Sequence, residues 1–200
     1  MRVHVAFTPQ EEAAAPLGIV VDVLRATSTI CQALASGDPT DRQISPTRFH
    51  NSVHNAPAGY WSIATGAMPS SSVLCAYDAS FGAGLLEALA QVASERVRSV
   101  LLAYDSDYPE PLRSTRPIPD SFGIALVLAP QRSEQSLARI AVATTREPAT
   151  TLADGELERM RVSIPAARGL PLLQTLATNA TGAIVIDYLD DTRLEIEVGT

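Results

Sequence analysis

The stretch from Asp22 to Ser28 carries the clearest anion chemistry in the N-terminal part of the chain. Asp22 closes an apolar run, and Arg25 can hold an anion through two N–H groups. Thr27 and Ser28 stand where a short helix is expected to begin, and a helix N-terminus attracts phosphate. Mg²⁺ usually needs one or two carboxylates, and Asp22 supplies one. The pattern predicts weak anion binding, with Mg²⁺ as a cofactor only under an alternative function.

A second candidate lies between the predicted strand 72–77 and the predicted helix 79–96. Asp78 occupies the junction, where its carboxylate can cap the helix and interact favourably with the helix dipole. Cys75 lies three residues earlier, inside the predicted strand. A residue three positions back on a strand points to the opposite face, so Cys75 is expected to be buried packing.

His50 and His54 are one helical turn apart and could form a metal pair. No third ligand is evident in the sequence, and a helix-surface or interface role is favoured. Two Cys and three His cannot build a zinc-finger pattern. We therefore predict no metal site and no resident cofactor.

The composition favours one well-buried domain, because 46% of the 200 residues are hydrophobic and only 18% are charged. All 15 basic residues are Arg, and 22 acids give a net charge of -7, which argues against a nucleic-acid partner. No apolar run approaches the roughly 20 residues of a membrane span, and no basic region precedes an apolar stretch. We expect no membrane contact, no secretory signal and a cytoplasmic location.

Strands and helices alternate first and strands cluster later, which predicts an α/β fold with a mixed sheet. The predicted strands are 1–7, 17–24, 72–77, 97–104, 123–128 and 138–144, with a closing hairpin of 184–188 and 194–198. The predicted helices are 29–35, 47–66 with an interruption at Pro57, 79–96, 152–160 and 170–177, and 105–120 is a predicted loop. The polar stretch 38–46 is a candidate junction between a segment 1–37 and a domain 38–200, which together form one compact unit.

Residues 45–198 resemble the β-ketoacyl synthase N-terminal-like family, of the chain-length-factor type found beside fatty-acid and polyene synthesis genes. The resemblance rests on SPTRFHNSVHNAPAGYWSIATG, SSVLCAYDASFGAGLLEALAQV, LLAYDSDYPEPL and FGIALVLAP. It implies half of a thiolase-like fold, with a mixed β-sheet flanked by helices.

The same resemblance implies an inactive site. A condensing enzyme needs a nucleophilic Cys at the tip of a strand-to-helix turn and two His residues from the second half of the fold. The nucleophile position falls on Asp78, a very poor acyl acceptor, and no His follows His54. No catalytic residue is therefore expected.

Four residues are candidates for a substrate channel or a subunit interface. Asn55 and Gly59 match family positions near the channel. Tyr60 and Trp61 could line an acyl tunnel, form a dimer contact or pack in the core.

Residues 1–37 resemble the N-terminus of 2-phosphosulfolactate phosphatase, a Mg-dependent enzyme of coenzyme M biosynthesis. The resemblance rests on MRVHVAFTP and GIVVDVLRATSTICQALASG and stops at Gly37. The sequence therefore looks like a fusion of two families.

Three functions compete at this point. The favoured one is a non-catalytic, chain-length-factor-like subunit that pairs with an active ketosynthase, or forms a homodimer, and meets an acyl carrier protein only indirectly because its own charge is negative. The alternatives are a Mg-dependent phosphatase and an inactive chimeric α/β domain.

Overall fold

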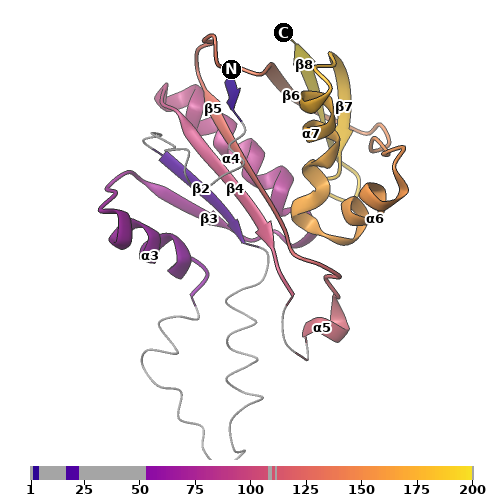
Figure 1. Ribbon diagram of the computed structural model, residues 1–200, viewed down its shortest axis with the longest axis horizontal. Coiled ribbons are helices and arrows are strands. Elements are labelled where there is room, and N and C mark those ends of the chain that lie inside the picture. The colour runs from indigo at the N-terminus through magenta and orange to yellow at the C-terminus, as the bar shows by residue number, and fades with distance from the viewer. Residues whose placement is uncertain (1, 5–16, 23–52, 108–109, 111, 200) are drawn as a thin grey trace, which may run out of the picture.

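The computed structural model describes residues 2–4, 17–22, 53–107, 110 and 112–199 (Figure 1). The strands are β1 (Arg2–His4), β2 (Leu17–Asp22), β3 (Ser71–Leu74), β4 (Ser99–Asp105), β5 (Phe122–Ala129), β6 (Arg139–Thr145), β7 (Gly182–Ile186) and β8 (Arg193–Gly199). The α-helices are α3 (Ala56–Thr65), α4 (Ser80–Glu95), α5 (Leu112–Thr115), α6 (Gly155–Ser163) and α7 (Leu170–Ala177). Two 3₁₀ helices are η1 (Tyr77–Ala79) and η2 (Pro165–Gly169).

A mixed sheet of five strands carries the candidate site. Its order is β1-β5-β4-β2-β3, and β2 is parallel to both β3 and β4. β4 and β5 are antiparallel, and so are β5 and β1. The strand predicted at 17–24 thus lies beside the strand predicted at 72–77, with Gly18 aligned with Ser71. Residues 5–7 and 23–24 of the predicted strands, and the whole predicted helix 29–35, lie outside the described residues.

The closing hairpin is confirmed, but it belongs to a second sheet. β7 and β8 pair antiparallel, and β6 pairs with the other edge of β8. Leu194, Ile196 and Val198 alternate along β8 and are buried, as the period of two in a strand requires. The three-stranded sheet β6-β8-β7 therefore has one face in the core.

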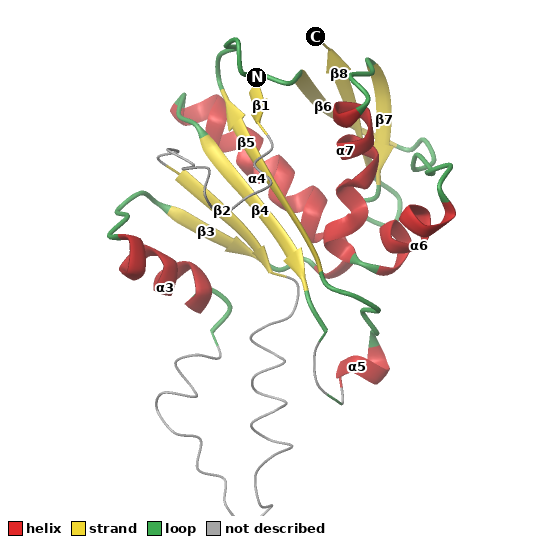
Figure 2. Cartoon of the chain, in the orientation of Figure 1, coloured by secondary structure: helices red, strands yellow, loops and turns green. Residues whose placement is uncertain are grey.

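Helix α4 is the centre of the fold and runs along one face of the five-stranded sheet (Figure 2). Its buried residues Phe81, Leu85, Ala88 and Val92 recur at helical spacing and form one stripe. This stripe belongs to a single hydrophobic cluster with side chains from β4, β5, α7 and both strands of the β7–β8 hairpin. One core thus joins the two sheets.

A close approach fixes η2 against α4. A Cβ added to Gly169 would lie 2.6 Å from the ring of Phe81, closer than real Cβ contacts allow. A second apolar cluster lies beside this contact and contains Ile118, Leu152, Ile164, Ala167 and Leu170. Gly169 is therefore required by packing, since any larger residue would push η2 away from α4.

The helix predicted at 47–66 was wrong at its N-terminal end. α3 begins at Ala56, residues 53–55 form a turn, and residues 47–52 lie outside the described residues. Pro57 does not interrupt this helix, because it lies in the first turn, where its missing N–H has no intrahelical partner to lose. The predicted loop 105–120 contains the short helix α5. No helix in the described ranges is long and apolar enough to cross a membrane.

Candidate functional site

A sharp turn connects β3 to α4. Tyr77 has a φ of 53°, a left-handed conformation that bulky residues rarely adopt. Ser80 is fully buried and holds this turn, since its Oγ donates to the carbonyl of Tyr77 at 2.7 Å and accepts from the N–H of Ala76 at 2.9 Å. The turn places Asp78 immediately before the N-terminus of α4. Strained backbone of this kind is common at functional sites.

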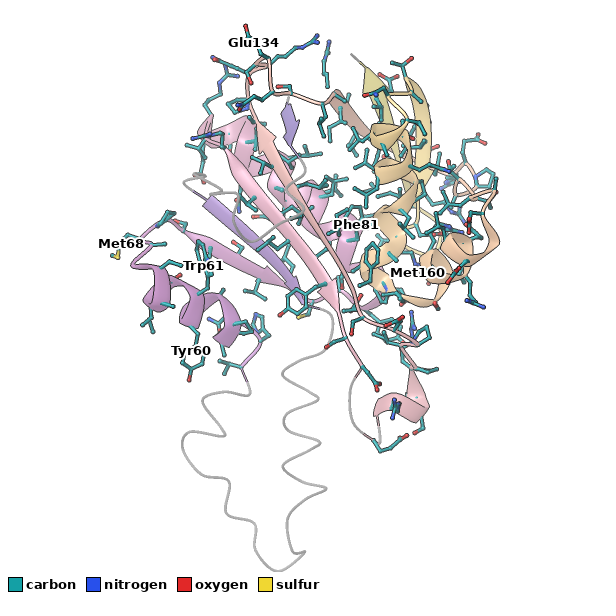
Figure 3. All side chains as sticks on the ribbon, in the orientation of Figure 1. Tyr60, Trp61, Met68, Phe81, Glu134 and Met160 are labelled. Atoms are coloured by element: carbon teal, nitrogen blue, oxygen red, sulfur yellow. The ribbon has the colours of Figure 1, made fainter. Side chains whose placement is uncertain are left out.

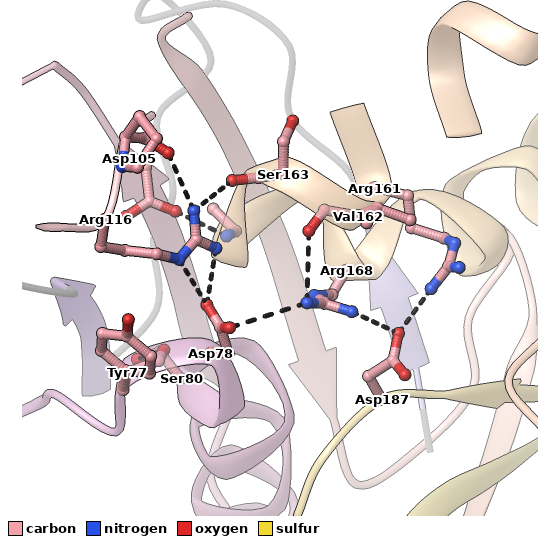
Figure 4. Close-up of polar contacts among 12 residues, drawn as sticks. Tyr77, Asp78, Ser80, Asp105, Arg116, Arg161, Val162, Ser163, Arg168 and Asp187 are labelled. Carbon is pink, nitrogen blue, oxygen red and sulfur yellow. Dashed lines mark hydrogen bonds and ion pairs between the residues drawn. The ribbon is translucent and has the colours of Figure 1, made fainter. Parts of the chain in front are cut away.

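Asp78 is engaged by two arginines (Figure 4). Nε and Nη2 of Arg116 donate to its Oδ1 at 3.2 and 2.7 Å, and Nη2 of Arg168 lies 3.9 Å from its Oδ2. The guanidinium of Arg116 also lies 5.9 Å from the ring centroid of Tyr77. The carboxylate at the tip of the turn is therefore held in an ion pair.

The ion pairs continue from Arg168 to the far side of the site. Asp187 accepts from Nη1 of Arg168 at 2.7 Å and from Nη1 of Arg161 at 2.5 Å. Arg161 in turn binds both carboxylate oxygens of Glu158, through Nε at 2.8 Å and Nη2 at 2.6 Å. Asp78 is thus linked to Glu158 through Arg168, Asp187 and Arg161.

Two pKa shifts follow from this arrangement. The hydrogen bonds from Arg161, and then the N–H of Leu152, lower the pKa of Glu158 to about 2. The hydrogen bond to Glu158 raises the pKa of Arg161, and the charge of Asp187 adds to the effect. Both residues remain charged over the whole physiological range.

Asp105 anchors the end of β4 to the same region. It is 6% exposed, and its Oδ2 accepts from the backbone N–H of Ala166 in η2 at 2.6 Å. Arg116 reaches the neighbouring segment from the other side, since its Nη1 donates to the carbonyl of Ser163 at 2.7 Å. The turn before α4, the end of β4 and the α6–η2 connection are thus tied together by charged hydrogen bonds.

Two predictions about this turn were wrong. Cys75 is exposed rather than buried, because β3 ends at Leu74 and Cys75 lies beyond the strand. Asp78 does not cap α4 with its side chain: the N-cap is Ala79, without a side-chain hydrogen bond. The intervening 3₁₀ turn directs the carboxylate of Asp78 toward Arg116 instead.

The channel or interface candidates lie on a different element. Asn55 is the N-cap residue of α3, and Gly59 lies inside this helix with open space around it. Tyr60 and Trp61 are 51% and 53% exposed, so they are not core residues (Figure 3). The roles in a channel or an interface stay predictions.

The anion-site residues are only partly described. Asp22 is the last residue of β2 and is aligned with Tyr104 of β4. Arg25, Thr27 and Ser28 lie outside the described residues. His54 is exposed in the turn before α3, and His50 also lies outside the described residues. Across the part of the chain that the structure describes, no three His, Cys, Asp or Glu side chains lie close enough together to hold a metal ion.

Sequence reasoning located Asp78 but missed its partners. Arg116 was placed in the predicted loop 105–120, and Arg168, Asp187, Arg161 and Glu158 were not singled out. Thirty-eight residues separate Asp78 from Arg116. The one available signal was the use of Arg for all 15 basic residues, which favours bidentate carboxylate pairs but does not say which carboxylates are bound.

Comparisons with known proteins show the family of the chain. The family model for the β-ketoacyl synthase N-terminal domain matches residues 24–185, so the chain belongs to that family. Residues 24–37 fall inside this match together with most of the later chain. No curated protein matches the sequence.

One solved structure with a similar fold is "Ketosynthase (ApeO) in Complex with its Chain Length Factor (ApeC) from Xenorhabdus doucetiae". The TM-score is 0.63 at 21% sequence identity, and the match covers 90% of this chain and 68% of that chain. At this identity the likeness shows the fold. The fold is the thiolase-like half-fold predicted from the resemblance, an α/β arrangement with a mixed sheet flanked by helices.

Proposed function

We propose that the chain is a non-catalytic, chain-length-factor-like subunit that pairs with an active ketosynthase in fatty-acid or polyketide biosynthesis. The observation that carries this proposal is that residue 78 is an aspartate and that its carboxylate is paired with an arginine. It lies at the tip of the strand-to-helix turn, where the family chemistry needs a thiolate, and its carboxylate is bound to Arg116.

The chemistry of acyl transfer supports an inactive site. A thioester intermediate needs a sulfur nucleophile and two backbone N–H groups that bind the developing oxyanion. A carboxylate is a weak nucleophile toward a thioester, and that of Asp78 is already hydrogen-bonded. Cys75 precedes the turn rather than occupying its tip.

The proposed partner is a catalytically active ketosynthase in the same compartment, the cytoplasm. The similar solved structure is a complex of a ketosynthase with its chain length factor, which supports such a pair. A surface on α3 also supports it. Tyr60 and Trp61 are half exposed there, and the sequence from 49 to 77 contains no Asp, Glu, Lys or Arg. Exposed aromatic residues without neighbouring charge are typical of interface centres.

The acyl carrier protein is expected to bind the partner rather than this chain. Carrier proteins are acidic, and a subunit with a net charge of -7 would repel them. The role of this chain is then to shape the acyl tunnel of the partner.

Co-expression with ketosynthases from neighbouring genes tests the proposal. A tagged chain should retain one of them through size-exclusion chromatography, and the pair should condense acyl substrates with a defined chain length. The variant Trp61→Ala should weaken the retention, whereas Leu189→Ala should not, because Leu189 is equally exposed on a different part of the chain. If Trp61→Ala abolished product formation but retained the ketosynthase as well as the natural chain does, the assigned interface would be contradicted. Retention of no ketosynthase at all would contradict the function.

A further inference from the structure

The carboxylate of Asp78 lies between two guanidinium groups that are each fixed by other contacts (Figure 4). This arrangement differs from a simple surface ion pair, in which each side chain is ordered by the other. The side chains of Arg116 and Arg168 are only 17% and 14% exposed, whereas that of Asp78 is 40% exposed. The cations are therefore built into the protein, and the anion faces the solvent.

Arg116 is anchored by two backbone carbonyls. Its Nη1 donates to the carbonyl of Ser163 at 2.7 Å and to that of Pro117 at 3.0 Å. The opposite edge, formed by Nε and Nη2, is directed at Oδ1 of Asp78. Since a guanidinium is planar and rigid, the two carbonyls fix the direction of that edge even without Asp78.

Arg168 is anchored by one carboxylate and one backbone carbonyl. Its Nη1 donates to Asp187 at 2.7 Å and its Nη2 to the carbonyl of Val162 at 3.3 Å. Its Nε is buried and finds no hydrogen-bond partner within the described ranges. A buried donor without a partner is costly. The atom of Arg168 that faces the site is Nη2, which lies 3.9 Å from Oδ2 of Asp78.

We propose that Arg116 and Arg168 form a carboxylate-binding site that Asp78 fills from within the chain. Removal of this one side chain opens the site to a small monocarboxylate from solution. In the natural chain the internal carboxylate excludes an external one, so the turn before α4 is closed to anionic acyl groups. This inference concerns the chain alone and goes beyond the proposed pairing with a ketosynthase.

The size of the vacated space predicts which anion binds. Asp78→Ala keeps Cβ and removes only the carboxyl group, so the missing volume corresponds to formate. Asp78→Gly removes Cβ as well, so the missing volume corresponds to acetate. An anion that is free in solution loses translational freedom on binding, and we expect dissociation constants on the order of 1–100 mM.

Thermal unfolding of the full chain tests the site, with sodium formate, sodium acetate and sodium chloride compared at equal ionic strength. The melting temperature of Asp78→Ala should be lower than that of the natural chain. Formate should restore at least half of this difference, and the effect should saturate as its concentration rises. The melting temperature of Asp78→Gly should rise more with acetate than with formate. The natural chain should gain nothing from either carboxylate beyond the effect of chloride.

Two further variants serve as controls. Asp107→Ala removes the carboxylate of an exposed pair with Arg113, where both side chains face solvent, and should show no specific recovery. Asp78→Ala combined with Arg116→Gln should lose the recovery by formate, because the bidentate edge is gone. If Asp78→Ala does not fold in chloride, its refolding yield in formate replaces the melting temperature as the measurement.

Equal behaviour of formate, acetate and chloride with both Asp78 variants, in melting or in refolding, would overturn the inference. So would recovery of the same size in Asp107→Ala. Because no ketosynthase is present in these measurements, either result would leave the proposed function unaffected.

Discussion

Asp78 and Arg116 are 38 residues apart in the chain, yet Nε and Nη2 of Arg116 both donate to one carboxylate oxygen of Asp78. This pair connects the strained turn before α4 to the segment that follows α5. Through the carbonyl of Ser163 it also reaches the end of α6. Asp78 and Arg116 together thus connect three parts of the chain.

The first prediction concerns the energetic coupling of this pair. Asp78→Ala, Arg116→Ala and the double variant form a cycle, and we expect a coupling free energy of about 0.5–3 kcal/mol. The reason is that two charge-assisted hydrogen bonds join the pair and one partner is largely buried. Urea unfolding of the natural chain, the two single variants and the double variant measures this coupling. If the losses of unfolding free energy in the single variants add up to the loss in the double variant, the pair is not coupled.

The second prediction concerns the core face of α4. Leu85 is fully buried in the main cluster, and Leu85→Ala should cost about 2–5 kcal/mol of unfolding free energy. Leu89 is only partly buried against the same cluster, so Leu89→Ala should cost less. Denaturant midpoints of the two variants measure the difference. Equal midpoints would mean that the helix does not bury the face assigned to it.

The third prediction concerns the contact between Gly169 and Phe81. Gly169→Ala should destabilise the protein by about 1–3 kcal/mol, because the new methyl group overlaps the ring. Gly155→Ala is the matched control, since nothing lies within 4 Å of its added Cβ. The control should be neutral or stabilising by about 0.4–1 kcal/mol. Equal destabilisation by both variants would show that backbone conformation rather than packing sets the requirement.

The fourth prediction concerns acid stability. The pKa of Glu158 is lowered from 4.5 to about 2, because Arg161 and the N–H of Leu152 bind the ionised form. The folded state therefore binds this proton less readily than the unfolded state, and the stabilisation is present above pH 4.5 and is lost as the pH falls toward 2. Unfolding free energies at pH 7 and in this window measure the effect.

The variant Glu158→Gln provides the control for that measurement. It removes the titrating group and keeps the side-chain shape, so it should be less stable than the natural chain at pH 7 and lose less stability on acidification. Identical pH profiles would rule out Glu158 as a source of the acid sensitivity.

The fold was predictable where local pattern determines structure. The apolar positions of α4 and the alternation along β8 are readable from the sequence, because each of these elements buries one periodic face. Family resemblance supplied the placement of Asp78. The start of α3 was mispredicted because the apolar spacing includes Val53, although residues 53–55 form a turn and the helix begins at Ala56.

The contacts around Asp78 could not have been read from the sequence. Arg116 lies between two prolines and near several acids, a composition that is typical of a solvated loop. Its direction depends on the carbonyls of Pro117 and Ser163, and these are brought to it by the packing of η2 on α4. Cys75 is likewise exposed because β3 ends at Leu74. Strand propensity does not determine the exact residue at which a strand ends.

The most direct test of the account is a search for an acyl-enzyme intermediate. The purified chain is incubated with an acyl-carrier thioester alongside an active ketosynthase, and both proteins are analysed by intact-mass and peptide mass spectrometry. For a non-catalytic subunit we expect stoichiometric acylation of the ketosynthase and no adduct on Cys75 or Asp78. A stoichiometric acyl adduct on either residue of this chain would contradict a non-catalytic role.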